Sequence, residues 1–359
     1  MSPIQGFVRL RKHQFGRQAS FGSAVAATKA YPISGVPDVN LNWTDREVDE
    51  GSRFRIATPY RGAPELSASY TDDAVEYNTL PKLMAALFGG GEVPTGGGTA
   101  QTWHFRPSSL TVDDPDLFTE EFGDDVLTDW YQFRDGVLDS IELTGEEGLG
   151  PIKGSYTWRY GAVASTGSTD SPVVGTVPTP DLAIDPEGVI IYLKDMGIFV
   201  ADSIAGLSGG QIMDALHAFA LRINVEWDEK RFANQAQNFD VNGYGPGLIG
   251  IELDATYAKT TDTVGTGSES DDWMSDQSVN RYIKLSFLCT VLAQTPSTFY
   301  SFDVIMPMRY YTRTETDING NTAIVLNAHA FYDPEDAEYA FDAVIVNTLT
   351  EEELGEVPS

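Results

Sequence analysis

The residues able to do chemistry are few in this sequence and stand far apart. Histidine serves both as a general base and as a metal ligand, and the chain has four of them without an HxH or HExxH pattern. A zinc site needs three or four ligands whose spacing brings them together on one or two elements. We therefore expect no metal ion at the histidines, which are His13, His104, His217 and His329.

A short run of oxygen donors, Asp317-x-Asn319-x-Asn321, has the alternation of a calcium-binding loop. Such a loop needs glycine at its sixth position and a bidentate glutamate at its twelfth. Here the glycine is Gly320, at the fourth position, and the twelfth residue is Ala328. We interpret the run as the tip of a β-hairpin.

Residues 206–210 read GLSGG and match the GxSxG pattern of a nucleophilic serine. That motif works where a buried parallel strand and a helix hold the serine on a sharp turn. The strands expected around Ser208 alternate as antiparallel strands do, and His329 would be an unsupported partner. The glycines at 89–98 lack the Lys-Ser/Thr of a phosphate loop.

We therefore expect no catalytic residue, no cofactor and no enzymatic activity. An esterase acting through Ser208 is one alternative. A glycosidase acting through a pair of carboxylates is another, although a chain with 53 acidic residues contains many such pairs by chance.

Composition bounds the class of protein. A length of 359 residues is typical of about two domains, and 42% apolar residues suffice for a core. Cys289 is the single cysteine, so a disulfide framework is excluded and a buried, inert thiol is expected. The first residues are too charged for a signal peptide and no stretch approaches 18 apolar residues, so we expect cytoplasmic synthesis and no membrane partner.

The formal net charge is −30, which repels nucleic acid and anionic membranes. The N-terminus is the exception, because it carries a cluster of cations. We interpret this cluster as a candidate intersubunit arm, with a solvated tail as the alternative. Its residues are Arg9, Arg11, Lys12 and Arg17.

The elements that would position any site read mainly as β-strands, and one stretch occurs twice. Residues 39–46 read VNLNWTDR and residues 223–230 read INVEWDEK, at an offset of 223 − 39 = 184. Apolar and polar residues alternate in both copies, which is the period of a strand with one buried face.

Two further matches occur in the same order. ELSASY at 65–70 recurs as ELDATY at 252–257, and Asp135-Gly136 recurs as Asn319-Gly320. Matches at a nearly constant spacing favour a duplicated unit.

One helix is expected at 80–88, because its apolar residues follow the helical period from Leu80 to Phe88. Thr79 would cap it and Gly89-Gly90 would end it. A weaker counterpart is expected near 271–279.

Two long hairpins are expected, one in each unit. Asp-Gly and Asn-Gly form their type I′ tips, and Pro307 indicates an edge position. The arms are 126–134 with 137–144, and 306–316 with 322–331.

Other strands and loops complete each unit. We expect further strands at 6–12, 23–43, 102–106, 152–160, 188–194 and 341–349, and long loops at 44–64 and 228–247.

The predicted fold is all-β, with two tandem β-sandwich or small-barrel domains, each flanked by a short helix. Residues 161–188 are rich in Ser, Thr, Gly and Pro without periodicity, which is typical of a linker. We place domain 1 at 1–165, the linker at 166–187, domain 2 at 188–349 and an acidic tail at 350–359.

At this point a family resemblance emerges. The run YRGAPELSASYTDDAVEYNTLPKLMAALFGG (60–90), followed by FGDDVLTDWYQFRDGVLDSIELTG (122–145), resembles the major tail tube proteins of long, flexible-tailed (siphovirus-type) bacteriophages. The resemblance covers mainly residues 20–160, and it extends to the second half only through the internal repeat. Its patterns are strands and turns rather than a catalytic fingerprint.

The resemblance implies a structural virion protein, assembled in the host cytoplasm. Tail tube units contribute strands to an oligomeric ring barrel, and the rings stack into a tube that conducts DNA during genome ejection. The duplication favours trimeric, pseudo-hexameric rings, with hexameric rings as the alternative. The implied partners are further copies of the chain, the tape-measure protein, and the tail terminator and distal tail proteins, whereas DNA would pass without specific binding.

An acidic lumen would repel the DNA backbone, and we expect the two long hairpins to line it. The candidate lumen-facing residues are Asp129, Asp139, Glu142, Thr312, Thr314, Glu315 and Thr316. The rival interpretation is a two-domain β-sandwich that binds carbohydrate or decorates a virion, which predicts a monomer with a concave aromatic patch.

Overall fold

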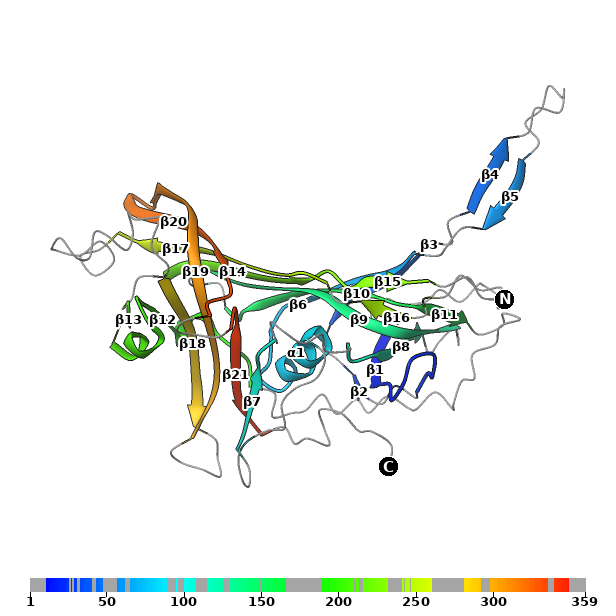
Figure 1. Cartoon of the computed structure of the whole chain (residues 1–359). Helices are drawn as coiled ribbons and strands as arrows, with labels where there is room; N and C mark the ends of the chain where they lie inside the picture. Colours follow the sequence, from blue (N-terminus) through cyan, green and yellow to red (C-terminus); the bar gives the residue numbers. More distant parts are fainter. Residues whose placement is uncertain are drawn as a thin grey trace, which may run out of the picture.

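The computed structural model of the chain is almost entirely β (Figure 1). It describes residues 11–25, 27, 29–30, 33–40, 43–47, 57–61, 65–88, 95, 100–107, 115–124, 129–146, 148, 150–165, 189–209, 211–212, 216–231, 241, 243–245, 247–259, 281–291, 298–334 and 339–348.

We call the first half of the chain unit 1. Its elements are β1 (Arg11–Arg17), β2 (Lys29–Ala30), β3 (Ser34–Asn40), β4 (Trp43–Glu47), β5 (Ala57–Arg61), β6 (Glu65–Asp72), α1 (Leu80–Phe88), β7 (Gln101–Phe105), β8 (Phe118–Asp124), β9 (Asp129–Glu146), β10 (Lys153–Arg159) and β11 (Ala162–Ser165).

We call the second half unit 2. Its elements are the 3₁₀ turn η2 (Leu193–Asp195), β12 (Met196–Ala201), the 3₁₀ turn η3 (Ile204–Gly209), β13 (Gln211–Ile212), β14 (Leu216–Val225), β15 (Asp228–Lys230), β16 (Gly243–Gly245), β17 (Ile249–Ala258), β18 (Arg281–Val291), β19 (Phe299–Ile318), β20 (Asn321–Ala330) and β21 (Asp342–Asn347).

The main sheet runs through both units without a break. Its antiparallel strand order is β3-β6-β10-β9-β14-β17-β20-β19. Side chains alternate between buried and accessible along these strands, as in β6, because successive residues point to opposite faces. One face therefore packs on the core and the other is polar. This all-β architecture agrees with the predicted fold class, but the sheet of a single chain is open rather than a closed barrel.

The long strands β9 and β19 each change partners along their length. The first part of β9 pairs with β8 and β11, and its last part pairs with β10. The first part of β19 pairs likewise with β18 and β21, and its last part with β20. The outer strands β1 and β12 pair with β8 and β18.

Strand pairing therefore has the same plan in both units, which confirms the internal duplication. Val39 pairs with Leu66 as Ile223 pairs with Ile251, so the match at offset 184 is one of structural position. The small hairpins agree as well, since Thr44 pairs with Tyr60 in β4–β5 and Asp228 pairs with Gly245 in β15–β16.

The other two sequence matches are not structurally equivalent. The β6–β10 pair of unit 1 is equivalent to the β17–β20 pair of unit 2. Ala68 pairs with Trp158 near the end of the first, and Leu253 pairs with Ala328 near the end of the second, so the true offset between β6 and β17 is 253 − 68 = 185. ELSASY and ELDATY are thus aligned two residues out of position, although on the same face, because the strand period is two.

The predicted hairpin at 126–144 is wrong. Residues 129–146 form one strand, and Asp135 lies inside it with φ 55°. Asp tolerates this left-handed conformation better than most residues, and the chain uses it to pass from the β11 pairing to the β10 pairing. The Asp-Gly dipeptide favours a type I′ turn in isolation, but here it forms a bend within one strand.

The second predicted hairpin is confirmed. Asn319 (φ 55°) and Gly320 (φ 84°) form the tip between β19 and β20, as a type I′ turn demands. Pro307, however, is not at an edge. It pairs with Tyr282 of β18 on one side, and its carbonyl accepts a hydrogen bond from the Phe331 amide on the other.

Other boundaries shift. Of the strand expected at 6–12, residues 11 and 12 belong to β1 and the others lie outside the described residues. The expected strand at 188–194 contains the turn η2, and the expected loops at 44–64 and 228–247 contain the β4–β5 and β15–β16 hairpins. Strands expected at 102–106, 152–160 and 341–349 are found as β7, β10 and β21. The weaker helix near 271–279, the linker at 166–187 and the acidic tail lie outside the described residues.

Helix α1 is where the sequence predicts it, and the carbonyl of Thr79 accepts the amides of Lys82 and Leu83 in its first turn. It packs against β9 and β7 below the long strands (Figure 1). Its apolar side chains are buried almost without exception. No helix among the described residues is long and apolar enough to span a membrane.

Strand β7 of unit 1 pairs with β21 of unit 2, so the units interlock. Trp103 Nε1 donates to Asn347 Oδ1 at 3.0 Å, and Asn347 Nδ2 donates to the Tyr77 carbonyl at 2.9 Å. Arg106 binds Asp342 at 2.6 Å across the same pair of strands. The predicted domain boundaries at 165 and 188 stay a prediction.

Candidate assembly site: the joint between the two units

The two units meet edge to edge, where β9 pairs antiparallel with β14. The register runs from Glu146 opposite Ala218 to Ser140 opposite Asn224. On the core side of this joint, Ile141 lies opposite Ile223, and both side chains are buried. Apolar cross-strand pairs of this kind stabilise a sheet, so the joint is held by burial on one face and by main-chain hydrogen bonds along its length.

On the polar face, Arg222 of β14 ties three strands together. It binds Glu142 of β9 at 2.8 Å and Asp254 of β17 at 2.5 Å. Asn327 of β20 then donates to Asp254 at 2.7 Å. This row of contacts crosses the joint and continues into unit 2.

The electrostatics of the row follow from these contacts. Partial burial raises the pKa of Asp254, but the hydrogen bonds from Asn327 and Arg222 outweigh it and leave that pKa below the ordinary value of an aspartate. The hydrogen bond to Asp254 raises the pKa of the Arg222 guanidinium. Both groups are therefore charged at neutral pH.

The polar face as a whole is rich in hydroxyls and carries more carboxylates than cations. Alternation along the eight strands assigns its residues. Its carboxylates are Asp38, Glu65, Asp139, Glu142, Glu146, Glu252 and Asp254, and its cations are Lys153, Arg159, Arg222 and Arg309. Ser and Thr occupy many of the remaining positions, including Ser67, Ser69, Thr71, Ser140, Thr144, Ser155, Thr157 and Thr256.

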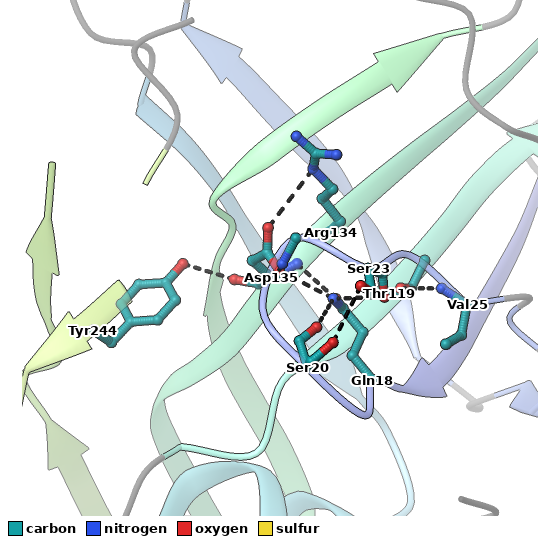
Figure 2. Close-up of polar contacts among 9 residues, drawn as sticks. Gln18, Ser20, Ser23, Val25, Thr119, Arg134, Asp135 and Tyr244 are labelled. Atoms are coloured by element: carbon teal, nitrogen blue, oxygen red, sulfur yellow. Dashed lines mark hydrogen bonds and ion pairs between the residues drawn. The ribbon is translucent and has the colours of Figure 1, made fainter. Parts of the chain in front are cut away.

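A second contact between the units lies at Asp135, where β9 changes partners (Figure 2). The Asp135 amide donates to Gln18 Oε1 at 2.7 Å, and its carboxylate accepts from Gln18 Nε2 at 3.0 Å and from the Gly22 amide at 2.6 Å. Tyr244 of β16 donates its hydroxyl to the Asp135 carbonyl at 2.7 Å. This network fixes the left-handed residue and attaches the β15–β16 hairpin to unit 1.

The β15–β16 hairpin makes further contacts with unit 1. The Phe21 ring lies 6.1 Å from the Tyr244 ring, and Arg159 donates to the Trp227 carbonyl at 3.4 Å. Burial raises the pKa of the Tyr244 hydroxyl, which therefore stays protonated and remains a donor. The joint thus has two parts, the β9–β14 pairing and the docked hairpin that follows β14.

Comparisons with solved structures add a likeness. A phage tail tube is among the solved structures that this chain matches. The structure of the SPP1 tail tube matches at 13% identity and a TM-score of 0.27, over 46% of this chain and 84% of that chain. No protein-family model matches the sequence, and no curated protein matches it.

The candidate lumen residues fall in different places. Glu142, Thr312, Thr314 and Thr316 lie on the polar face, and Asp139 reaches it by binding Arg159 at 2.8 Å. Glu315 has the opposite orientation along β19 and binds Lys259 at 2.6 Å. Asp129 lies at the far end of β9, opposite Asp124 of β8.

The candidate arm is largely part of the fold. Arg11, Lys12 and Arg17 belong to β1, which pairs with β8 along its whole length, and Arg17 binds Asp116 at 2.7 Å. Arg9 lies outside the described residues. An arm that reaches a neighbour could therefore include only residues that precede β1.

The residues singled out for chemistry are not brought together. Ser208 is exposed in the turn η3, where its hydroxyl faces the Ala205 carbonyl, and the described residues around it form no strand–turn–helix elbow. His329 lies on the polar face, 3.4 Å from Glu252. Asp317 accepts the Gly320 amide at 2.9 Å, as a hairpin tip does. Among the described residues no cluster of His, Cys, Asp or Glu is suited to hold a metal ion.

Sequence reasoning missed Arg222 and Asp135 as residues of the joint. A lone cation within the apolar alternation of LHAFALRINV was a usable signal for Arg222, because a charge there must face away from the core and find a partner. Asp135 carried no such signal, since its neighbours at Gln18 and Tyr244 are distant in the sequence.

Proposed function

We propose that this chain is a non-enzymatic wall protein of a phage tail tube, which polymerises as stacked rings around a lumen that conducts DNA. The observation that carries the proposal is the continuous eight-stranded sheet with its hydroxyl- and carboxylate-rich face. Two four-stranded repeats joined edge to edge are suited to a ring in which further repeats continue the same sheet.

The open sheet is a physical reason for assembly. A sheet with exposed edges is a template for pairing with other chains, and ring closure removes the edges. A heterologous contact that closes makes a ring, and rings can stack into filaments. Because each chain carries two repeats, a ring of three chains supplies six repeats.

The polar face suits a lumen. DNA carries about one negative charge per 1.7 Å of its axis, so a surface with more carboxylates than cations does not retain it. Hydroxyls supply hydrogen bonds to water without fixed positive charge. Genome could therefore slide past this face, and the tape-measure protein, the tail terminator and the distal tail proteins are the other partners that this role requires.

Negative-stain microscopy and native mass measurement of the purified protein test the proposal. We expect rings or tubes, with a ring mass of three chains of 39.2 kDa each. A ring of six chains would correct the stoichiometry and keep the role. A monomer at all concentrations, with affinity for a glycan array, would overturn the proposal in favour of a carbohydrate-binding module.

A further inference from the structure

The joint between the units has a counterpart, two strand edges for which the described residues of the chain supply no partner. Among the described residues, β3 pairs with β6 only, and the end of β19 pairs with β20 only. These are the first and last strands of the eight-stranded sheet. Their equivalents in the other unit, β14 and β9, pair with each other.

Structural equivalence fixes which residues would meet. β9 and β19 each carry a bulge against the following strand, with Asp139 skipped in β9 and Tyr311 skipped in β19. Residues 140–146 of β9 therefore correspond to 312–318 of β19. Because Val39 and Ile223 are equivalent, β3 residues 34–40 correspond to 218–224 of β14.

The hairpins that follow these strands differ in the same way, because one is docked on a neighbouring unit and the other is not. β15–β16 follows β14 and docks on unit 1 through Tyr244 and Asp135. β4–β5 follows β3 in the same way, with an equivalent strand register, yet it projects away from the body of the molecule (Figure 1).

We propose that β3 of one chain pairs with the end of β19 in a second copy of this chain, and that β4–β5 docks on unit 2 of that copy. This pairing rests on the proposed function and names the contact that closes the ring. Transferring the register of the β9–β14 joint places Asn40 opposite Thr312, Asp38 opposite Thr314, Val36 opposite Thr316 and Ser34 opposite Ile318.

The exposed side chains suit this register on the polar face. Val36 is 50% exposed in the single chain, and a β-branched partner at Thr316 is a favourable cross-strand neighbour. The Thr314 hydroxyl can donate to the Asp38 carboxylate. This pair would stand where Glu142 and Arg222 stand in the joint within the chain.

On the opposite face the two joints differ in a way that makes assembly reversible. Leu143 lies opposite Leu221 within the chain, whereas Glu315 would lie opposite Pro37 between chains. Proline at a sheet edge turns its missing N–H outward, and charged residues on the inward face of an edge discourage indiscriminate pairing. The contact between chains is thus weaker than the contact within one, and the chain stays soluble before assembly.

Disulfide cross-linking tests the register. In a Cys289→Ser background, the pair Asp38→Cys and Thr314→Cys places the two thiols directly opposite. The pair Asp38→Cys and Thr312→Cys is the matched control, because diagonal neighbours lie about 7–8 Å apart, beyond the reach of a disulfide. Each single-cysteine variant is examined by microscopy to show that it still folds and assembles.

We expect the directly opposed pair to form disulfides between chains, giving a ladder that ends at the covalently closed ring, with at least tenfold less product from the diagonal pair. Equal or greater cross-linking of the diagonal pair would overturn the register. Rings or tubes without cross-linking of the opposed pair would overturn the edge pairing and leave the proposed function standing.

Cross-linked chains that never form rings or tubes would support the edge pairing and overturn the proposed function. A protein that neither cross-links nor assembles would overturn both.

A hairpin variant tests the second contact. Replacing residues 43–61 by a short Gly-Ser turn removes β4–β5 and leaves β3 in place. We expect an unchanged thermal midpoint for the monomer and a loss of ring formation. Normal rings from this variant would overturn the docking of β4–β5.

Discussion

At the scale of single residues, Asp135 decides the path of β9. It takes a left-handed conformation that few residues adopt, and two partners far away in the sequence, Gln18 and Tyr244, hydrogen-bond to it. The side chain is almost fully buried. Its carboxylate is therefore part of the fold, not a group available to a ligand.

Asp135→Ala should destabilise the protein by about 2–4 kcal/mol, because it removes a buried acceptor and strains a left-handed residue. Asp135→Asn keeps a side-chain oxygen and tolerates the same φ, so about 1 kcal/mol is expected. Urea unfolding of both variants measures the difference. Equal losses in the free energy of unfolding for the Ala and Asn variants would show that neither the side-chain acceptor nor the left-handed backbone conformation of Asp135 contributes to stability.

The pair formed by Arg222 and Asp254 predicts a pH dependence. The pKa of Asp254 is lowered in the folded protein, so the stability that it contributes is present above the unfolded pKa of about 3.9 and is lost as pH falls through the folded pKa. Asp254→Asn should therefore flatten the fall of the thermal midpoint below about pH 4.

Glu65→Gln serves as the matched control for that measurement, since it neutralises a carboxylate of the same face, in β6 and away from Arg222. An acid profile that changes equally in both variants would show that general charge, rather than the Arg222 contact, governs it.

At the scale of elements, α1 supports the first unit from below the sheet. Leu83, Met84 and Leu87 are buried in the main hydrophobic core. The Phe88 ring lies 5.4 Å from the ring of Phe341 in unit 2. The helix therefore helps to hold both units in one core, in addition to the β7–β21 pairing.

Leu87→Ala should cost about 2–4 kcal/mol, because it leaves a cavity between α1 and its neighbours. Lys82→Ala, at the partly accessible position of the same helix, should cost less than about 1 kcal/mol, because a solvent-accessible polar contact contributes little more than that. Chemical denaturation with both variants checks this. Similar small losses would show that α1 is not packed into the core.

At the scale of the whole molecule, charge opposes association. A net charge of −30 makes copies of the chain repel one another. This repulsion is screened by salt, since the Debye length falls from about 30 Å at 0.01 M to about 8 Å at 0.15 M. The proposed rings must form against it.

Raising the salt concentration over this range should therefore lower the protein concentration at which rings or tubes appear. Sedimentation or light scattering follows the assembly, and sucrose at matched osmolality is the control. Assembly that weakens as salt rises would indicate that attractive ion pairs, rather than edge pairing against a repulsive background, hold the chains together.

The sequence by itself determined the local elements with a strong period. The apolar spacing of 80–88 predicted α1, Asn319-Gly320 predicted the β19–β20 tip, and the stretch at 39–46 with its copy at 223–230 predicted the duplication. Neither copy is the single strand that was expected, because the first spans the end of β3 and the start of β4, and the second spans the end of β14 and the start of β15. The helix and the tip depend on residues close together in the chain, where period and turn chemistry act directly. The duplication was visible because a short pattern recurs 184 residues later.

Only the tertiary structure decided how these elements join. Asp135-Gly136 has the chemistry of a turn, but neighbours from β11, Gln18 and Tyr244 make it a bend within one strand. The pairing of β9 with β14, and of β7 with β21, follows no local pattern. Edge pairing depends on which backbone groups are left unpaired once each unit has folded, and that is a property of the assembled sheet rather than of any stretch of sequence.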